Sequence, residues 1–306
     1  MKNGFWRATV LFALVLAVSA FLCSGCGAGK SQKFLKDGLD AYRQGRWSEA
    51  VDFFNLGLES KPGDTSMLTL RGICFLKMAD YTKAYSDFAE ILANHPEDLE
   101  AKKGRGEACL GMKRYPEAAS DFSEVLSVDR TDTNTMNNRA YAYSSMGAFD
   151  KAMADFDTVI AQDAKNPVAY YNRAMVFYKM DHMDKAKADL DKGLELDPNN
   201  AIMLAARGRI LYGQGKWDDA LEDYNSAISK DPDYFGGFKY RAGFYKNQGD
   251  WQKAYEDYNR AIELMPTDPE LYFERGAVAF QLKDEAQYQK DMDEFNKLSG
   301  GESTVQ

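Results

Sequence analysis

The sequence repeats itself every 34 residues, and this period restricts the fold more than any other feature of the chain. Counted in steps of 34 from Ser31, the eighth residue of every unit is small: Gly38, Gly72, Gly106, Ala140, Ala174, Gly208, Ala242 and Gly276. The twentieth residue is alanine in the first seven units and Tyr288 in the eighth. A period of this length is typical of stacked architectures in which each unit packs only on its neighbours. We therefore expect a row of similar units.

The spacing inside each unit predicts two amphipathic helices. Small residues at positions 8 and 20 let two helix backbones approach, and a large residue at position 24 fills the remaining space. Position 24 holds Phe54, Phe88, Phe122, Phe156, Leu190, Tyr224, Tyr258 and Met292. Proline cannot continue a helix, and it closes five units: Pro62, Pro96, Pro198, Pro232 and Pro266. Arg130 and Ala164 replace this proline, so the turns after units three and four are less firmly specified.

The same short motif begins the second half of several units. It starts with glycine, has an aromatic residue third and ends in alanine: Gly45–Ala50, Gly147–Ala152, Gly215–Ala220 and Gly249–Ala254. The whole pattern resembles that of the tetratricopeptide repeat (TPR) family, from residue 31 to about residue 300. The resemblance implies an all-α fold, a right-handed α-solenoid of about eight 34-residue helix-turn-helix repeats. It also implies a role in binding other proteins.

The register gives the expected boundaries of these repeats. We predict repeats at 31–64, 65–98, 99–132, 133–166, 167–200, 201–234, 235–268 and 269–298. A short linker over 27–30 and a flexible tail over 299–306 would flank them. The last repeat is predicted to be a polar cap, because Tyr288 and Met292 replace its small and aromatic residues and charge is dense from Lys290 to Lys297.

A second periodic feature pairs opposite charges. Position 7 of repeats two to eight holds Arg71, Arg105, Arg139, Arg173, Arg207, Arg241 and Arg275. Sixteen residues later stand Asp87, Asp121, Asp155, Asp189, Asp223, Asp257 and Asp291. Repeat one has neither the arginine nor the aspartate. If the pairs form within each repeat, every arginine and every aspartate of the series therefore has a partner. We predict a ladder of partly buried Arg–Asp bridges between the two helices of each repeat, with an anion site as the alternative.

Residues 1–26 have the features of a signal peptide. Lys2 and Arg7 precede an apolar run of fifteen residues, Ala8 to Leu22, which is shorter than the roughly 20 residues that span a bilayer. The ending Ser24-Gly25-Cys26 resembles the lipobox of bacterial lipoproteins, and the resemblance implies that Cys26 is lipidated. Cys23 departs from that pattern, since the family usually has leucine there.

The residues after Cys26 bear on the destination of the protein. Gly27 and Ala28 lack the acidic residue that retains lipoproteins in the inner membrane of enteric relatives. The resemblance thus implies an outer-membrane lipoprotein facing the periplasm. Cleavage after Ala20 is the alternative, and it would yield a soluble periplasmic or secreted protein. An uncleaved anchor comes third.

The composition disfavours several other functions. The chain has 38 basic and 47 acidic residues, with the two signs interleaved, whereas nucleic-acid binding needs a clustered excess of cations. His95 and His182 lack partners at the spacing of a triad or a metal site. We therefore predict no enzyme activity, no cofactor and no metal. Cys74 and Cys109 are predicted to be buried free thiols, and a bond between them is the alternative.

The resemblance also implies where a partner binds. TPR ligands usually lie along the concave face, on positions 2, 5, 6, 9, 12 and 13 of the first helices. In repeats four to six these positions include Asn137, Asn138, Tyr141, Tyr171, Asn172, Met175, Tyr178, Lys179, Arg209 and Tyr212. Amides and tyrosines suit a peptide backbone, and the two cations suit acidic groups. The alternative is that the tyrosines pack against the neighbouring helix.

The sequence therefore predicts a protein–protein adaptor, anchored in the bacterial cell envelope through a lipidated N-terminus and binding peptide or protein partners of the envelope. A soluble periplasmic or secreted scaffold is the second hypothesis. An enzyme or a small-ligand binder is the third. The sequence leaves self-association and the cellular process open.

The first two hypotheses differ in the mass of the mature N-terminus. We expect mass spectrometry of protein purified from its host membranes to find a lipid-modified peptide that begins at Cys26. An unmodified peptide that begins at Phe21 would instead establish the soluble form.

Overall fold

The computed structural model describes residues 28–300. The predicted signal peptide over 1–26, with Cys26, and the last six residues of the predicted tail lie outside the described residues. Within residues 28–300 the chain forms sixteen helices and no strand. Contacts between Cα atoms divide it into two compact units, and the chain passes from one to the other between Arg130 and Thr131. This division falls at a turn that lacks the closing proline.

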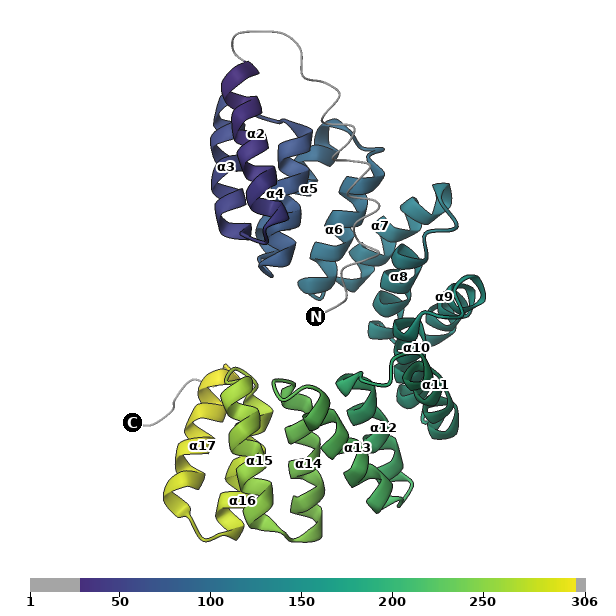
Figure 1. Ribbon diagram of the computed structural model, residues 1–306, viewed down its shortest axis with the longest axis vertical. Coiled ribbons are helices and arrows are strands. Elements are labelled where there is room, and N and C mark those ends of the chain that lie inside the picture. The colour runs from purple at the N-terminus through teal and green to yellow at the C-terminus, as the bar shows by residue number, and fades with distance from the viewer. Residues whose placement is uncertain (1–27, 301–306) are drawn as a thin grey trace. The chain divides into compact units, whose positions relative to one another are not determined.

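The first unit contains three helix pairs (Figure 1). Its helices are α2 (Ala28–Arg43), α3 (Trp47–Ser60), α4 (Thr65–Lys77), α5 (Tyr81–Asn94), α6 (Leu99–Gly111) and α7 (Tyr115–Val128). α2 begins inside the segment predicted to be a linker over 27–30, so residues 28–30 are helical. Proline is absent there, and Ala28 and Lys30 favour a helix, so the first helix extends beyond the repeat register.

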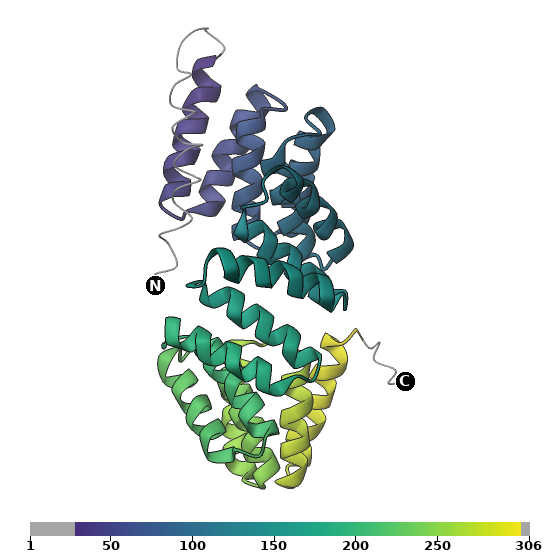
Figure 2. The same ribbon diagram turned by 90° about the vertical axis from the view of Figure 1, so that its right-hand side faces the viewer.

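The second unit contains five helix pairs. Its helices are α8 (Thr133–Ser145), α9 (Phe149–Gln162), α10 (Pro167–Lys179), α11 (Met183–Leu196), α12 (Ala201–Gly213), α13 (Trp217–Lys230), α14 (Phe235–Gln248), α15 (Trp251–Leu264), α16 (Pro269–Gln281) and α17 (Glu285–Leu298). In Figure 1 the pairs from α12 to α17 lie side by side in chain order, and Figure 2 shows the same helices from a direction turned by 90°.

Contacts within each unit follow the chain order. Each first helix packs on the second helix of its own repeat, and that second helix packs on the first helix of the next repeat. The first helices α12 and α14 also contact each other directly. The predicted all-α solenoid fold is therefore confirmed.

The small-to-large packing predicted inside each repeat is present. A Cβ atom added to Gly106 would lie 2.6 Å from the Phe122 ring, and one added to Gly208 would lie 2.6 Å from the Tyr224 ring. Phe122 and Tyr224 are almost fully buried. The large residue at position 24 therefore occupies the space that the small residue at position 8 leaves open.

Polar caps start most first helices, a feature that the sequence analysis did not predict. The last residue of a repeat accepts hydrogen bonds from the backbone at the start of the next first helix. These caps are Asp64, Asp98, Asp132, Asn166, Asn200 and Asp268. Such caps stabilise a helix by about 1 kcal/mol each, so they fix where each repeat begins.

Both cysteines of the described residues lie in the first unit and are buried and free. Burial raises the pKa of the Cys74 thiol to about 12 and contributes most to raising that of Cys109 to about 11. Both thiols are therefore protonated at neutral pH. The prediction of buried free thiols is confirmed.

The predicted Arg–Asp ladder is also confirmed. In repeats two to eight, the arginine Nε and Nη2 donate to the two carboxylate oxygens of the aspartate sixteen residues later. In Arg207 these distances to Asp223 are 2.8 and 2.7 Å. The hydrogen bonds that Arg207 donates to Asp223 are the largest cause that raises the pKa of Arg207, which therefore stays charged.

Five of these arginines make a further bond that was not predicted. Their Nη1 donates to the residue at position 25 of the preceding repeat. The pairs are Arg71–Asn55, Arg173–Asp157, Arg207–Asp191, Arg241–Asn225 and Arg275–Asn259. One guanidinium thus connects both helices of its own repeat to the second helix of the repeat before it.

The ladder leads to a test of stability. In Asp223→Ala, Arg207 keeps its charge but loses its buried carboxylate, so we expect the free energy of unfolding to fall by about 3 kcal/mol. Glu195→Ala is the control, because the bridge from Glu195 to Lys192 is exposed to solvent and should contribute little to stability. Urea denaturation followed by circular dichroism would measure both. Equal effects of the two substitutions would contradict a structural role for the ladder.

Candidate partner-binding face

All ten residues predicted to bind a partner lie on the first helices α8, α10 and α12 of the second unit. Positions 2, 5, 6, 9, 12 and 13 recur at three- and four-residue steps and so share one side of a helix. We call the surface that these positions form on α8, α10, α12 and α14 the first-helix face.

Arg209 lies at the centre of this face, between two tyrosines. Its Nη2 donates to Tyr178 Oη at 3.1 Å and its Nη1 to Tyr240 Oη at 3.4 Å. The guanidinium carbon is 4.9 Å from the Tyr178 ring centroid and 4.7 Å from that of Tyr240. Cation–π contacts of this kind orient a guanidinium without neutralising it. Among the described side chains, Arg209 has no carboxylate partner, unlike the arginines of the ladder.

The other cations on the face differ in how they are neutralised. Lys239 bonds Asp268 and Glu270, and Lys246 bonds Glu274. Exposed Lys179 donates to Ser144 Oγ at 3.4 Å, which is a neutral acceptor. Within the part of the chain that the structure describes, Lys179 and Arg209 are thus the cations of this face that have no carboxylate partner.

Several predicted residues do pack against neighbouring helices. Tyr171, Met175 and Tyr178 are partly buried against the core between α10 and α12, and burial raises the pKa of Tyr171. Tyr212 turns to the next repeat and meets the Phe244 ring edge-on, with 5.9 Å between centroids. The three tyrosines thus pack against neighbouring helices, as the alternative stated, and their role in binding a partner stays a prediction.

The remaining predicted residues are more accessible or bond one another. Asn172 Nδ2 donates to Asn137 Oδ1 at 3.1 Å, which links α10 to α8. Asn138 is half-buried. Tyr141 is 47% exposed, which makes it the most accessible aromatic side chain of the predicted set.

Sequence reasoning missed Tyr240 and Ser144. Both occupy positions that the register already marks, position 6 of repeat seven and position 12 of repeat four. Extending the register by one repeat would have found Tyr240. Its contact with Arg209 could not be foreseen, because it depends on how closely α12 and α14 approach.

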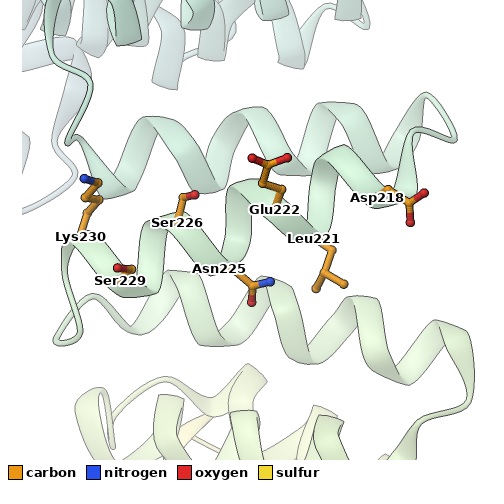
Figure 3. Close-up of a pocket in the computed structure, with 7 residues that line it drawn as sticks. All are labelled: Asp218, Leu221, Glu222, Asn225, Ser226, Ser229 and Lys230. Carbon is orange, nitrogen blue, oxygen red and sulfur yellow. The ribbon is translucent and has the colours of Figure 1, made fainter.

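The surface of α13 offers no comparable arrangement. A shallow hollow there is lined by seven residues of this one helix, from Asp218 to Lys230 (Figure 3). One of them, Asn225, already accepts a hydrogen bond from Arg241 at 2.7 Å. The hollow therefore does not bring groups together from different elements.

Residues 28–300 contain no group of three or more His, Cys, Asp or Glu side chains arranged to hold a metal ion. None of the helices in this range combines the length and the apolar character needed to cross a membrane.

Comparison with known families identifies the repeats. Models described as tetratricopeptide repeat match residues 69–134, 133–166, 167–200 and 201–234, and a model described as TPR repeat matches 244–283. The chain is a TPR protein. TPR repeats generally mediate protein–protein interaction and scaffolding, and the TPR fold is typically non-enzymatic. The search of curated proteins found no match.

Solved structures resemble this TPR protein in fold. A tetratricopeptide repeat protein from Parabacteroides merdae has a TM-score of 0.73 and 14% identity, and the match covers 81% of this chain and 98% of that one. IFIT1 in complex with m7Gppp-AAAA has a TM-score of 0.66 and 17% identity, with 89% and 69% covered. A chain of the APC/C hetero-tetramer Cut9–Hcn1 has a TM-score of 0.65 and 15% identity, with 88% of this chain and 53% of that one covered. At these identities the likeness concerns the fold alone.

The packing of the tyrosines in this TPR protein predicts unequal effects on stability. We expect Tyr171→Ala to lower the free energy of unfolding by about 2–3 kcal/mol, because it opens a cavity against the α10–α12 core. Tyr141→Ala at the exposed position should change it by about 0.5 kcal/mol or less. Thermal unfolding of the two variants beside the parent protein checks this. A larger loss in Tyr141→Ala would show that the two roles are reversed.

Proposed function

We propose that this protein is an interaction scaffold whose first-helix face binds an acidic peptide segment of a partner protein. The observation that carries the proposal is Arg209, held between Tyr178 and Tyr240 without a carboxylate. A guanidinium in this setting is oriented and partly dehydrated, so a ligand carboxylate gains more from it than from a fully hydrated surface cation.

Neighbouring groups extend this site along the peptide. Lys179 supplies a second cation one repeat earlier, and Tyr141 supplies exposed aromatic area. Asn137 and Asn172 can bond a peptide backbone as donors and acceptors. This set suits an extended or helical segment that carries at least two acidic side chains.

We further propose that the scaffold is exported and anchored in the outer membrane, facing the periplasm, through lipidated Cys26. The apolar run after Lys2 and Arg7 and the lipobox-like ending at Cys26 support this. A soluble periplasmic or secreted scaffold is the second candidate, supported by Val18-Ser19-Ala20, after which ordinary signal-peptide cleavage would occur. In either case the natural partners would be proteins of the cell envelope.

The peptide-binding proposal can be tested with two matched charge reversals. The full-length protein and its Lys179→Glu and Lys192→Glu variants would be used to capture partners from detergent-solubilised envelopes of the host. Lys192 is the control, because it is an exposed lysine of α11, outside the first-helix face. We expect Lys179→Glu to lose the partners that Lys192→Glu retains.

A second measurement examines the chemistry of recognition. Peptides from the captured partner would be titrated with their acidic side chains replaced by the corresponding amides. Loss of one carboxylate that contacts Arg209 or Lys179 should weaken binding about tenfold. Partners held equally by all variants, or peptides unaffected by the amide replacements, would refute an acidic ligand on this face.

A further inference from the structure

The end of the second unit carries a surface that differs from the predicted polar cap. In α16, Phe273 is 47% exposed and Phe280 is 59% exposed. Their rings pair with α17, since Phe273 lies 5.4 Å from Phe295 and Phe280 lies 5.6 Å from Tyr288 between centroids. We call these four residues and Asp293 the terminal face. The charge that runs from Lys290 to Lys297 does not cover the aromatic rings.

All of these residues except Tyr288 hold positions that contact a following repeat elsewhere in the unit. Position 12 meets the next first helix, as Tyr212 meets Phe244. Position 5 does so as well, as Asn137 meets Asn172. Phe280 and Phe273 hold positions 12 and 5 of repeat eight.

Position 27 behaves in the same way. A Cβ atom added to Gly193, at position 27 of repeat five, would lie 2.8 Å from Met203 Sδ on the next first helix. Phe295 holds this position in repeat eight. The terminal face therefore continues the interface that each repeat of the unit offers to the next, but no described helix packs on it.

The polar part of that interface is also present. Five position-25 residues accept a hydrogen bond from the position-7 arginine of the following repeat, as Asp191 accepts from Arg207 at 3.0 Å. Position 25 of repeat eight is Asp293, an exposed residue whose described partner is Gln289 of the same helix. Asp293 thus stands where an incoming arginine would bind.

We propose that the terminal face docks an amphipathic helix of a partner protein, in the place that a ninth first helix would take. The helix would carry an arginine with an apolar residue four positions before it and another three positions after it. This is the arrangement of Ala169, Arg173 and Val176 in α10. The arginine would pair with Asp293, and the apolar residues would cover Phe273, Phe280 and Phe295.

A second copy bound head to tail does not fit this face. The corresponding positions 3, 7 and 10 of α2 hold Lys33, Asp37 and Asp40. Docking α2 there would bring Asp37 against Asp293 and would place charges over the aromatic rings. Between these two occupants, the charges favour a helix from another protein. The proposal concerns a different surface from the first-helix face and does not depend on the proposed function.

The probe is a synthetic peptide with the sequence of residues 167–179, held helical by a hydrocarbon staple on its polar side and labelled for fluorescence anisotropy. A second peptide carries Arg173→Glu. We expect the full-length protein to bind the first peptide and to bind the second about tenfold more weakly. Phe280→Asp should reduce binding of both peptides by at least tenfold. Because Phe280 is largely exposed, this variant should keep its circular dichroism spectrum.

Charge reversal on the protein makes the test specific. We expect Asp293→Arg to weaken binding of the peptide that carries Arg173 and to restore binding of the Arg173→Glu peptide. In the second case an ion pair forms again, with the positive charge on the protein and the negative charge on the peptide. Lys179→Glu on the first-helix face should leave both affinities unchanged. Binding unaffected by Phe280→Asp, or lost in Lys179→Glu instead, would overturn the proposal.

The oligomeric state of the protein alone gives an independent check. Sedimentation velocity should find no dimer that depends on Phe280. A dimer of the parent protein that Phe280→Asp dissociates would show that two terminal faces bind each other, and this result would overturn docking of a partner helix.

Discussion

The alignment of one repeat on the next depends on the position-7 arginine, which in five repeats connects three helices at once. A single helix pair cannot bury its apolar faces, so each repeat is stable only against its neighbours. Apolar packing provides most of that stability, but it has little directional preference. The guanidinium adds directional hydrogen bonds, because its N–H groups donate to one carboxylate in the same repeat and to one side-chain oxygen in the preceding repeat. The bridges therefore help to fix the register between repeats as well as within them.

The distribution of partners among the cations separates structure from recognition. Arginines of the ladder are neutralised by aspartates held in place by the same helices. Arg209 is held by tyrosines instead, and Lys179 by a serine. Among the described cations of the first-helix face, these two are therefore the ones without a carboxylate of the protein's own. The terminal face shows the opposite arrangement, because there the carboxylate of Asp293 has no cationic partner among the described residues.

The sequence predicted most of the fold, because a period of 34 residues repeats each packing constraint many times. The small and large positions and the Arg–Asp pairs could be deduced from spacing alone. The bonds from Arg207 to Asp191 and from Arg209 to Tyr240 could not, since they depend on the distance between neighbouring repeats. Nor could the sequence decide whether Tyr171 packs against a neighbouring helix or binds a partner, because a tyrosine at this position suits both roles. The exposed Phe273 and Phe280 were missed because the charges of α17 suggested a polar end.

The two buried cysteines have a consequence for how the protein can be studied. Cys74 and Cys109 both belong to the first unit, and each thiol stays protonated and covered while its repeat is folded. A thiol-specific reagent can modify them only when that part of the chain opens. Their rate of modification would therefore report the local opening of the first unit alone. The molecule thus carries a built-in chemical reporter for one of its two units, without an introduced label.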